Sequence, residues 1–204
     1  MRTLLRRSGR LRALLAAAPV AAFVIALLVS GSAGAAEPPP PTEKAVIDMV
    51  VKGKKLSFEG PESVYEGQEL EVFNDTNPRQ VGPHTFSLVE KSTLPKTKSA
   101  EKSCFTPGHI CMSIAKWHGF NPKTEKITIN PVKAGPLGWS TMGNNKGKKG
   151  DSWFTGESKK GTHTIEKVTA KAGTTLYFIC AVHPWMQGSV KVLPAPVTPP
   201  PTTP

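Results

Sequence analysis

The sequence predicts an all-β protein. Between its two ends, short apolar runs alternate with turn-forming Gly, Pro, Asn and Lys, and no run keeps a helical apolar spacing over three turns. Eight runs have the length and composition of β-strands, which suits a sandwich of two sheets. They are residues 45–51, 55–59, 69–74, 84–90, 126–130, 162–170, 174–180 and 189–193.

The first 36 residues predict an export signal peptide. Five arginines lie within the first 12 residues, an apolar block covers residues 13–29, and small residues follow as far as Ala36. A retained membrane anchor is the alternative, because the block is nearly long enough to span a bilayer. No later segment is apolar enough to cross a membrane. We therefore expect the mature chain outside the cytoplasm, either secreted, periplasmic or associated with the cell envelope.

The rest of the chain predicts one folded domain with two tethers. Residues 37–44 form a Pro-rich linker, residues 45–193 the domain, and residues 194–204 a Pro/Thr-rich disordered tail. Within the domain, residues 91–161 are rich in Lys, Gly, Ser, Thr and Pro, and we expect them to form an elaborated insertion. We expect a monomer.

The charge of the chain argues against a nucleic-acid partner. The formal net charge is +11, and removal of the five signal arginines lowers it to +6. Neither of the remaining lysine clusters has aromatic residues interleaved with its lysines, as single-strand binding uses. The clusters are Lys146, Lys148 and Lys149, and then Lys159 and Lys160. We expect these lysines to form a solvated face, and docking to an anionic partner is the alternative.

Three metal-binding side chains follow the strand 174–180. Cys180, His183 and Met186 succeed one another at spacings of three. Thiolate and thioether suit reduced copper, and imidazole serves both oxidation states, so a set of two His, one Cys and a distant Met suits a copper ion that changes state. The missing imidazole is supplied by His84, which opens the strand 84–90.

The alternation of side chains along both strands predicts that the metal ligands face the core. His84 alternates with Phe86 along one strand, and Cys180 alternates with Phe178 along the other. One ligand opens its strand and the other closes its strand. Antiparallel pairing of the two strands would bring both ligands to the same rim of the sandwich.

These motifs resemble the cupredoxins, the family of type 1 blue copper proteins. The resemblance rests on the C-x-x-H-x-x-M loop that ends a Y-x-F-x-C strand and precedes Gly188, and on the Pro-His pair at His84. The ligand loop is most like those of amicyanin and plastocyanin. The resemblance covers residues 45–90 and 162–193, and residues 91–161 match nothing in the family.

The resemblance implies a fold, a cofactor and a function. It implies an antiparallel cupredoxin-like Greek-key β-sandwich, with a long insertion between the first His ligand and the Cys-His-Met loop. It also implies one type 1 copper ion held by His84, Cys180, His183 and Met186. The implied function is one-electron transfer to redox partner proteins that dock briefly near His183.

Residues next to the ligands have expected supporting roles. In cupredoxins an Asn ties the two ligand segments together, and here either Asn74 or Asn77 takes that role by resemblance. Pro184 fixes its own backbone and restricts His183, which favours a rigid loop. Trp185 is either packed within the loop or part of an apolar docking patch around His183.

Cys104 and Cys111 form the remaining cysteine pair. An oxidising compartment favours a disulfide between them, and the Pro-Gly turn inside the short loop lets its ends meet. The alternative is a second metal site, because His109, Met112 and His118 lie nearby in the sequence.

The function expected from the sequence is that of an electron carrier and not an enzyme. Multidomain copper oxidases need further His-x-His and His-Cys-His clusters, which the chain lacks. Copper storage or delivery at the cell envelope is the alternative, although storage favours chains that are rich in Met and His, and this chain has five of each. A binding module without metal is a further alternative.

Overall fold

The structure is a computed structural model, and it describes residues 43–127, 133–134, 137–156 and 160–196. The predicted signal peptide, most of the Pro-rich linker and the tail from residue 197 lie outside the described residues. Among the described residues, no helix is long and apolar enough to cross a membrane.

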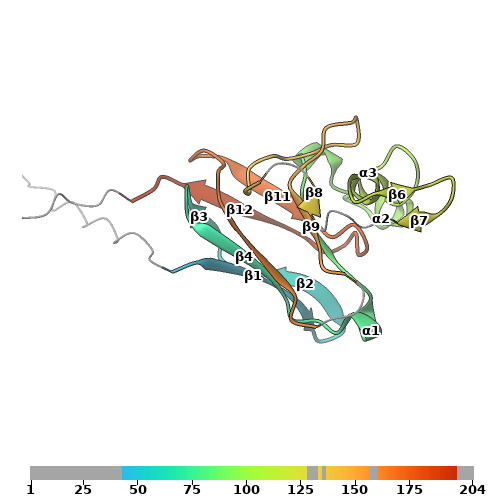
Figure 1. The fold of residues 1–204 in the computed structure, drawn as a ribbon, viewed down its shortest axis with the longest axis horizontal. Helices are drawn as coiled ribbons and strands as arrows, with labels where there is room; N and C mark the ends of the chain where they lie inside the picture. Colours follow the sequence, from blue (N-terminus) through green and yellow to red (C-terminus); the bar gives the residue numbers. More distant parts are fainter. Residues whose placement is uncertain (1–42, 128–132, 135–136, 157–159, 197–204) are drawn as a thin grey trace, which may run out of the picture. The chain divides into compact units, whose positions relative to one another are not determined.

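Two β-sheets form the body of the domain (Figure 1). The first sheet has the order β10-β4-β1-β2, with β1 at Ala45–Lys52, β2 at Lys55–Glu59, β4 at Glu69–Asn74 and β10 at His163–Lys167. The second sheet has the order β3-β12-β11-β5-β9-β8. Its strands are β3 at Ser63–Tyr65, β5 at Thr85–Leu88, β8 at Lys133–Ala134, β9 at Ser152–Phe154, β11 at Thr175–Ile179 and β12 at Gln187–Leu193.

The connections between the sheets have a Greek-key pattern. The chain changes sheet between β2 and β3, β3 and β4, β4 and β5, β9 and β10, and β10 and β11. This confirms the predicted all-β sandwich. The sandwich is not wholly antiparallel, because β1 pairs in parallel with β4 and β12 pairs in parallel with β3. Both parallel pairs arise because the strands reach their neighbours through crossovers and not through hairpins.

The core lies between the two sheets and draws on both. The first sheet contributes Ile47, Met49, Leu70 and Val72, and the second contributes Val64, Phe86, Leu88, Leu176, Phe178, Val190 and Val192. The rings of Phe86 and Phe178 lie 4.7 Å apart between centroids. The strands 84–90 and 174–180 therefore turn the predicted faces inward.

Residues 91–161 contribute to the sandwich as well as extending beyond it. Trp139 and Trp153 are buried in the core between the sheets, and the indole N–H of Trp139 donates to the carbonyl of Leu70 at 3.2 Å. Strand β9 pairs with β5 and so adds to the second sheet. Strands β8 and β9 of this segment thus help to build the sheet that carries the ligands.

Another part of the segment forms a small helical layer. It contains a 3₁₀ turn at Lys91–Thr93, α2 at Lys98–Ser103, α3 at Ile110–Trp117 and the short hairpin of β6 at Phe120–Asn121 with β7 at Lys126–Ile127. The expected strand 126–130 therefore begins as β7, and its last three residues lie outside the described residues. The disulfide between Cys104 and Cys111 is present and buried, which joins the end of α2 to the start of α3.

A second buried cluster connects this layer to the second sheet. Ile110, Ile114 and Trp117 from α3 pack with Ile179 and Ala181. Ile179 is the last residue of β11, and Ala181 lies in the loop that follows it. The helical layer therefore rests directly on the segment that carries Cys180.

The short helix α1 at Pro78–Val81 leads the chain into β5. The side chain of Asn77 caps it by accepting from the backbone N–H of Arg79, and Pro78 occupies its first turn, where no N–H is needed. Gly82 ends the helix at φ +80°, a conformation that favours glycine. His84 follows two residues later, directly before β5.

Candidate metal centre

The pairing of β5 with β11 brings two of the predicted ligands together. The strands are antiparallel, with Ser87 opposite Ile179 and Leu88 opposite Phe178. His84 directly precedes β5 and Cys180 directly follows β11, so both stand at the same rim of the second sheet. This is the arrangement that the alternating faces of the two strands predicted.

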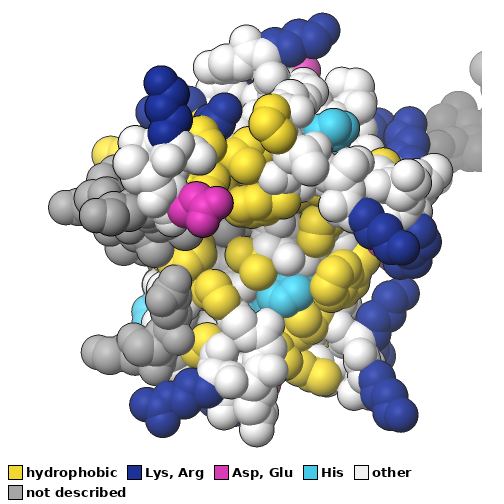
Figure 2. Space-filling model, turned by 90° about the vertical axis from the view of Figure 1, so that its right-hand side faces the viewer, with side chains coloured by type: hydrophobic (Ala, Val, Ile, Leu, Met, Phe, Trp, Pro, Cys, Tyr) yellow, Lys and Arg dark blue, Asp and Glu magenta, His cyan; other side chains and the backbone are white. Residues whose placement is uncertain are grey.

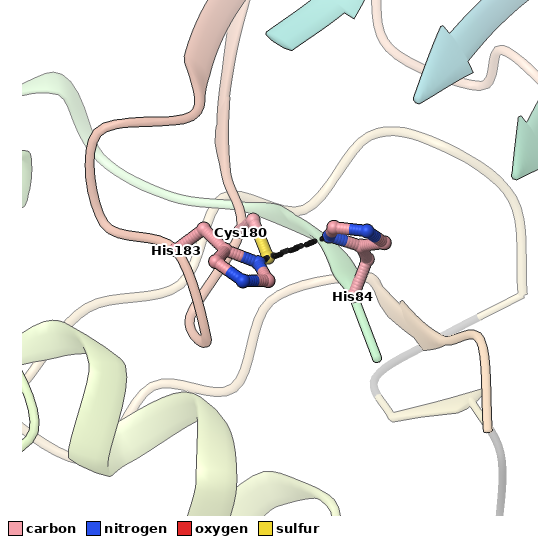
Figure 3. Close-up of side chains that lie close together, drawn as sticks. All are labelled: His84, Cys180 and His183. Carbon is pink, nitrogen blue, oxygen red and sulfur yellow. Dashed lines mark hydrogen bonds between the residues drawn. The ribbon is translucent and has the colours of Figure 1, made fainter. Parts of the chain in front are cut away.

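Three donor atoms converge at this rim (Figure 3). The sulfur of Cys180 lies 3.7 Å from Nδ1 of His84 and 3.6 Å from Nδ1 of His183. The two Nδ1 atoms are 3.1 Å apart. All three side chains are buried. Within the described residues, this is the single cluster of three or more His, Cys, Asp or Glu side chains with metal-binding geometry.

These separations suit one metal ion bound by all three atoms. Metal bonds to nitrogen and sulfur of about 2.0–2.3 Å, at angles of roughly 100–120°, separate the donor atoms by roughly 3.1–3.7 Å. A thiolate and two imidazoles are also the equatorial set that copper takes in electron-transfer sites. The cluster therefore fits a type 1 copper site.

Met186 lies in the same loop, and its backbone makes two hydrogen bonds that close the loop. Its N–H donates to the carbonyl of His183 at 2.7 Å, and its own carbonyl accepts from the N–H of Cys180 at 2.9 Å. The side chain is buried in the core cluster that also contains Cys180. Its role as a metal ligand stays a prediction.

His84 is oriented by a hydrogen-bonded pair behind it. Nε2 of His84 lies 2.9 Å from the hydroxyl oxygen of Thr76, and that hydroxyl lies 2.7 Å from Oδ1 of Asn74. The Thr76 hydroxyl has one hydrogen, which goes to Asn74, so it accepts from Nε2–H of His84. This fixes the tautomer of His84 and leaves Nδ1 free to bind a metal.

Thr85 ties the two ligand segments together. Its N–H donates to the sulfur of Cys180 at 3.4 Å, and its hydroxyl oxygen accepts from the N–H of Ala181 at 2.8 Å. The sequence left this role between Asn74 and Asn77. The structure places Asn74 behind Thr76 and Asn77 at the cap of α1.

Sequence reasoning missed Thr76 and Thr85 as supporting residues. One feature of the sequence pointed to Thr85, which is its position directly after the ligand His84. The register of β5 with β11 then places it beside the segment of Cys180. Thr76 had only its place in a polar loop after β4, and its contact with His84 depends on the turn that α1 makes.

Burial shifts the proton affinities of the donors. It lowers the pKa of His84 to about 4, and the neighbouring His183 adds to that shift. Burial also lowers the pKa of His183 and raises the pKa of the Cys180 thiol to about 11. At neutral pH the metal-free site therefore holds two neutral imidazoles and a protonated thiol.

Exposed apolar side chains form a rim around His183, which is itself slightly exposed. Trp185 is 42% exposed and its ring centroid lies 5.2 Å from that of His183, while Val182 is 38% and Phe105 43% exposed. Figure 2 shows this end of the molecule, where apolar side chains gather around a histidine and Lys and Arg side chains stand at the edges. Pro184 lies between the two aromatic rings in sequence, and its carbonyl accepts from the amide of Gln187 at 2.7 Å.

The other residues that the sequence singled out lie elsewhere. The disulfide occupies Cys104 and Cys111, so they are not metal ligands. His109 contacts the hydroxyl of Thr106, and His118 contacts that of Ser152. The alternative of a second metal site at these residues is therefore wrong.

Comparisons with known proteins give weak similarity. No family model matches the sequence, and no curated protein matches it. Among solved structures, auracyanin A, a "blue" copper protein from the green thermophilic photosynthetic bacterium Chloroflexus aurantiacus, is 14% identical with a TM-score of 0.36, covering 74% of this chain and 99% of that one. Auracyanin B is 11% identical with a TM-score of 0.40, covering 78% and 93%.

Metal binding should release about one proton at neutral pH. Because the pKa of Cys180 is about 11 and those of both His residues lie below their ordinary value, the thiol is the group that must ionise. The affinity for Zn²⁺, which does not oxidise thiols, should rise about tenfold per pH unit between roughly pH 7 and 10. Calorimetric titration in buffers of different ionisation enthalpy measures the proton count. Release of no proton by the native protein would contradict this assignment, and Cys180→Ser is the control that should release none.

Removal of the Thr76 hydroxyl should weaken metal binding. Thr76→Val leaves the buried Nε2–H of His84 without its acceptor, and loss of such a partner typically costs about 10–100-fold in metal affinity. Competition titration against a chelator measures the change. Thr76→Ser keeps the hydroxyl and should bind as the native protein does. Equal affinities for the Val and Ser variants would show that the contact does not orient the ligand.

Proposed function

We propose that the protein is a one-electron carrier with a single type 1 copper ion. His84, Cys180 and His183 would hold the ion, with Met186 as the fourth ligand. The observation that supports this most is the convergence of two imidazole nitrogens and one thiol sulfur within bonding reach of a single point. When bound, copper supplies a change between its two oxidation states.

The protein holds its ligands before the metal arrives. Thr76 fixes the ring of His84, Thr85 fixes the segment of Cys180, and two backbone hydrogen bonds close the loop from Cys180 to Met186. Donors that cannot move keep similar positions in both oxidation states. Little rearrangement then opposes electron transfer.

Burial of the donors favours a carrier over an enzyme or a storage protein. His84 and Cys180 are 0% exposed, and His183 is 8% exposed. An enzyme needs room for a substrate at the metal, and a storage or delivery protein needs ligands that exchange the metal readily. A closed site with one slightly exposed ligand suits the passage of an electron alone.

The apolar rim supports docking of redox partner proteins near His183. The imidazole of His183 is the donor closest to solvent, and Trp185 and Val182 give it an apolar surround. Electron-transfer partners meet over small, short-lived interfaces, which suits a small apolar face. We expect the protein to be a monomer and to work outside the cytoplasm, as the predicted signal peptide implies.

The copper-loaded protein should show the intense visible band of thiolate-to-copper charge transfer. Cys180→Ser should abolish the band, because it removes the thiolate. Met186→Leu should keep the band and raise the reduction potential, because loss of a thioether donor destabilises the oxidised ion more than the reduced ion. Visible and paramagnetic resonance spectra with a redox titration measure these effects. A colourless complex between copper and the native protein would refute the proposal.

Truncation of Trp185 should slow electron exchange between protein molecules. Trp185→Ser removes most of the apolar contact beside His183, and loss of one central aromatic residue costs about tenfold or more in binding. NMR line broadening in mixtures of oxidised and reduced protein measures the self-exchange rate. Ile165→Ser on β10 is the control, because Ile165 is a similarly exposed apolar side chain on the other sheet. Oxidation by ferricyanide, a small reagent, should proceed at the native rate, and an unchanged self-exchange rate would contradict docking at Trp185.

A further inference from the structure

His118, at the end of α3, is buried next to the second sheet and takes no part in the ligand set. It is 3% exposed, and its backbone N–H donates to the carbonyls of Ile114 and Ala115, which fixes its place at the end of the helix. Its Nε2 lies 2.8 Å from the hydroxyl oxygen of Ser152 on β9. A buried imidazole in the helical layer thus touches the sheet that carries the ligands.

A chain of buried hydroxyls continues from this contact to the ligand segment. Ser152 and Ser87 are opposite each other in the pairing of β9 with β5, and their hydroxyl oxygens lie 2.7 Å apart. The hydroxyl of Ser87 donates to that of Thr85 at 3.0 Å. Thr85 in turn accepts from the N–H of Ala181 and donates its own N–H to the sulfur of Cys180.

The contacts from His118 through Ser152 and Ser87 to Thr85 form a hydrogen-bond relay, and its direction follows from its last member. The Thr85 hydroxyl donates to the carbonyl of Ile179 at 3.5 Å and accepts from Ser87. Each hydroxyl has a single hydrogen, and that of Ser87 goes to Thr85. Ser152 must therefore donate to Ser87, and Nε2–H of His118 must donate to Ser152. From His118 to Thr85 each donor points toward the ligand segment, an alignment in which neighbouring bonds strengthen one another, and the Thr85 hydroxyl accepts from Ala181 on its other side.

We propose that His118 is a positioning residue of the metal centre. Through Ser152 and Ser87 it holds the Thr85 side chain in the orientation that accepts from Ala181, and so keeps the N–H of Thr85 on the sulfur of Cys180. Residues 91–161 thus adjust the reduction potential of the metal that the proposed function places at this site.

The relay should raise the reduction potential of the bound metal. Hydrogen bonds donated to the cysteine sulfur tune the potential of such a site. The reduced site has one more negative charge than the oxidised site, so a donor aimed at the sulfur stabilises the reduced form. Loosening of the relay should therefore lower the potential.

The test compares His118→Leu, Ser152→Ala and the double variant. Each single variant should lower the potential of the copper-loaded protein, changing the equilibrium with a one-electron mediator by roughly two- to tenfold, the factor that one hydrogen bond commands. The double variant should lower it no further, because both changes cut the same relay. His118→Gln, which keeps an N–H donor of similar reach, should restore most of the native value.

One control tests whether His118 acts through packing, and a second measurement tests the relay in the absence of metal. Ile114→Val changes the same helix in the cluster that packs on Ala181 without touching the relay, and it should keep the native potential. In the metal-free protein, His118→Leu and Ser152→Ala should both shift the NMR signal of the Ala181 amide and speed its hydrogen exchange, and His118→Gln should not.

Additive effects in the double variant, or an equal fall in potential for Ile114→Val, would show that His118 acts by packing and would overturn the proposal. So would an unmoved Ala181 amide in the metal-free variants, or a moved amide with an unchanged potential. Failure of the native protein to form a blue copper complex would instead contradict the proposed function, and the amide measurements would still decide whether the relay exists.

Discussion

The antiparallel pairing of β5 with β11 is the contact on which the metal centre depends. It joins segments more than ninety residues apart, and its register sets Ser87 opposite Ile179. A shift of one residue would turn every side chain of a strand to its other face. Cys180 would then leave the rim, and Thr85 would lose both of its contacts with the ligand segment. The aromatic core of Phe86 and Phe178 holds this register, so the packing of the sandwich and the geometry of the site are one constraint.

The sequence predicted those parts of the structure that local pattern controls. The longer strands have alternating or continuous apolar runs, and the ligand loop has its donors at regular spacings, so both were found. Strands β3, β8 and β9 have only two or three residues each, and α3 has two turns, which is too short for a helical period to stand out. The supporting contacts could not be found from pattern at all. Ser152 meets Ser87 because of a register between distant strands, and Thr76 reaches His84 because of a turn at Gly82.

Buried hydrogen bonds restrict the motion of the side chains around the site. A buried polar group without a partner is costly, whereas a connected set rigidifies the structure around it. Here Asn74 and Thr76 support one ligand, and Thr85 with the two serines supports another. The helical layer adds a third support, since the amide of Gln187 donates both to Pro184 in the ligand loop and to Pro95 in residues 91–161. Contacts from the sandwich, the ligand loop and the helical layer therefore all hold the donor side chains in place.

The placement of the disulfide also has a consequence for how the chain oxidises as it folds. Three thiols allow three pairings, and only one leaves Cys180 free. Cys104 and Cys111 are separated by seven positions, whereas either pairing with Cys180 closes a loop roughly ten times longer, at an entropic cost about 2 kcal/mol greater. Loop closure therefore favours the local pair over either pairing with Cys180. Burial of the Cys180 thiol in the folded chain then shields the cysteine of the metal centre from oxidants.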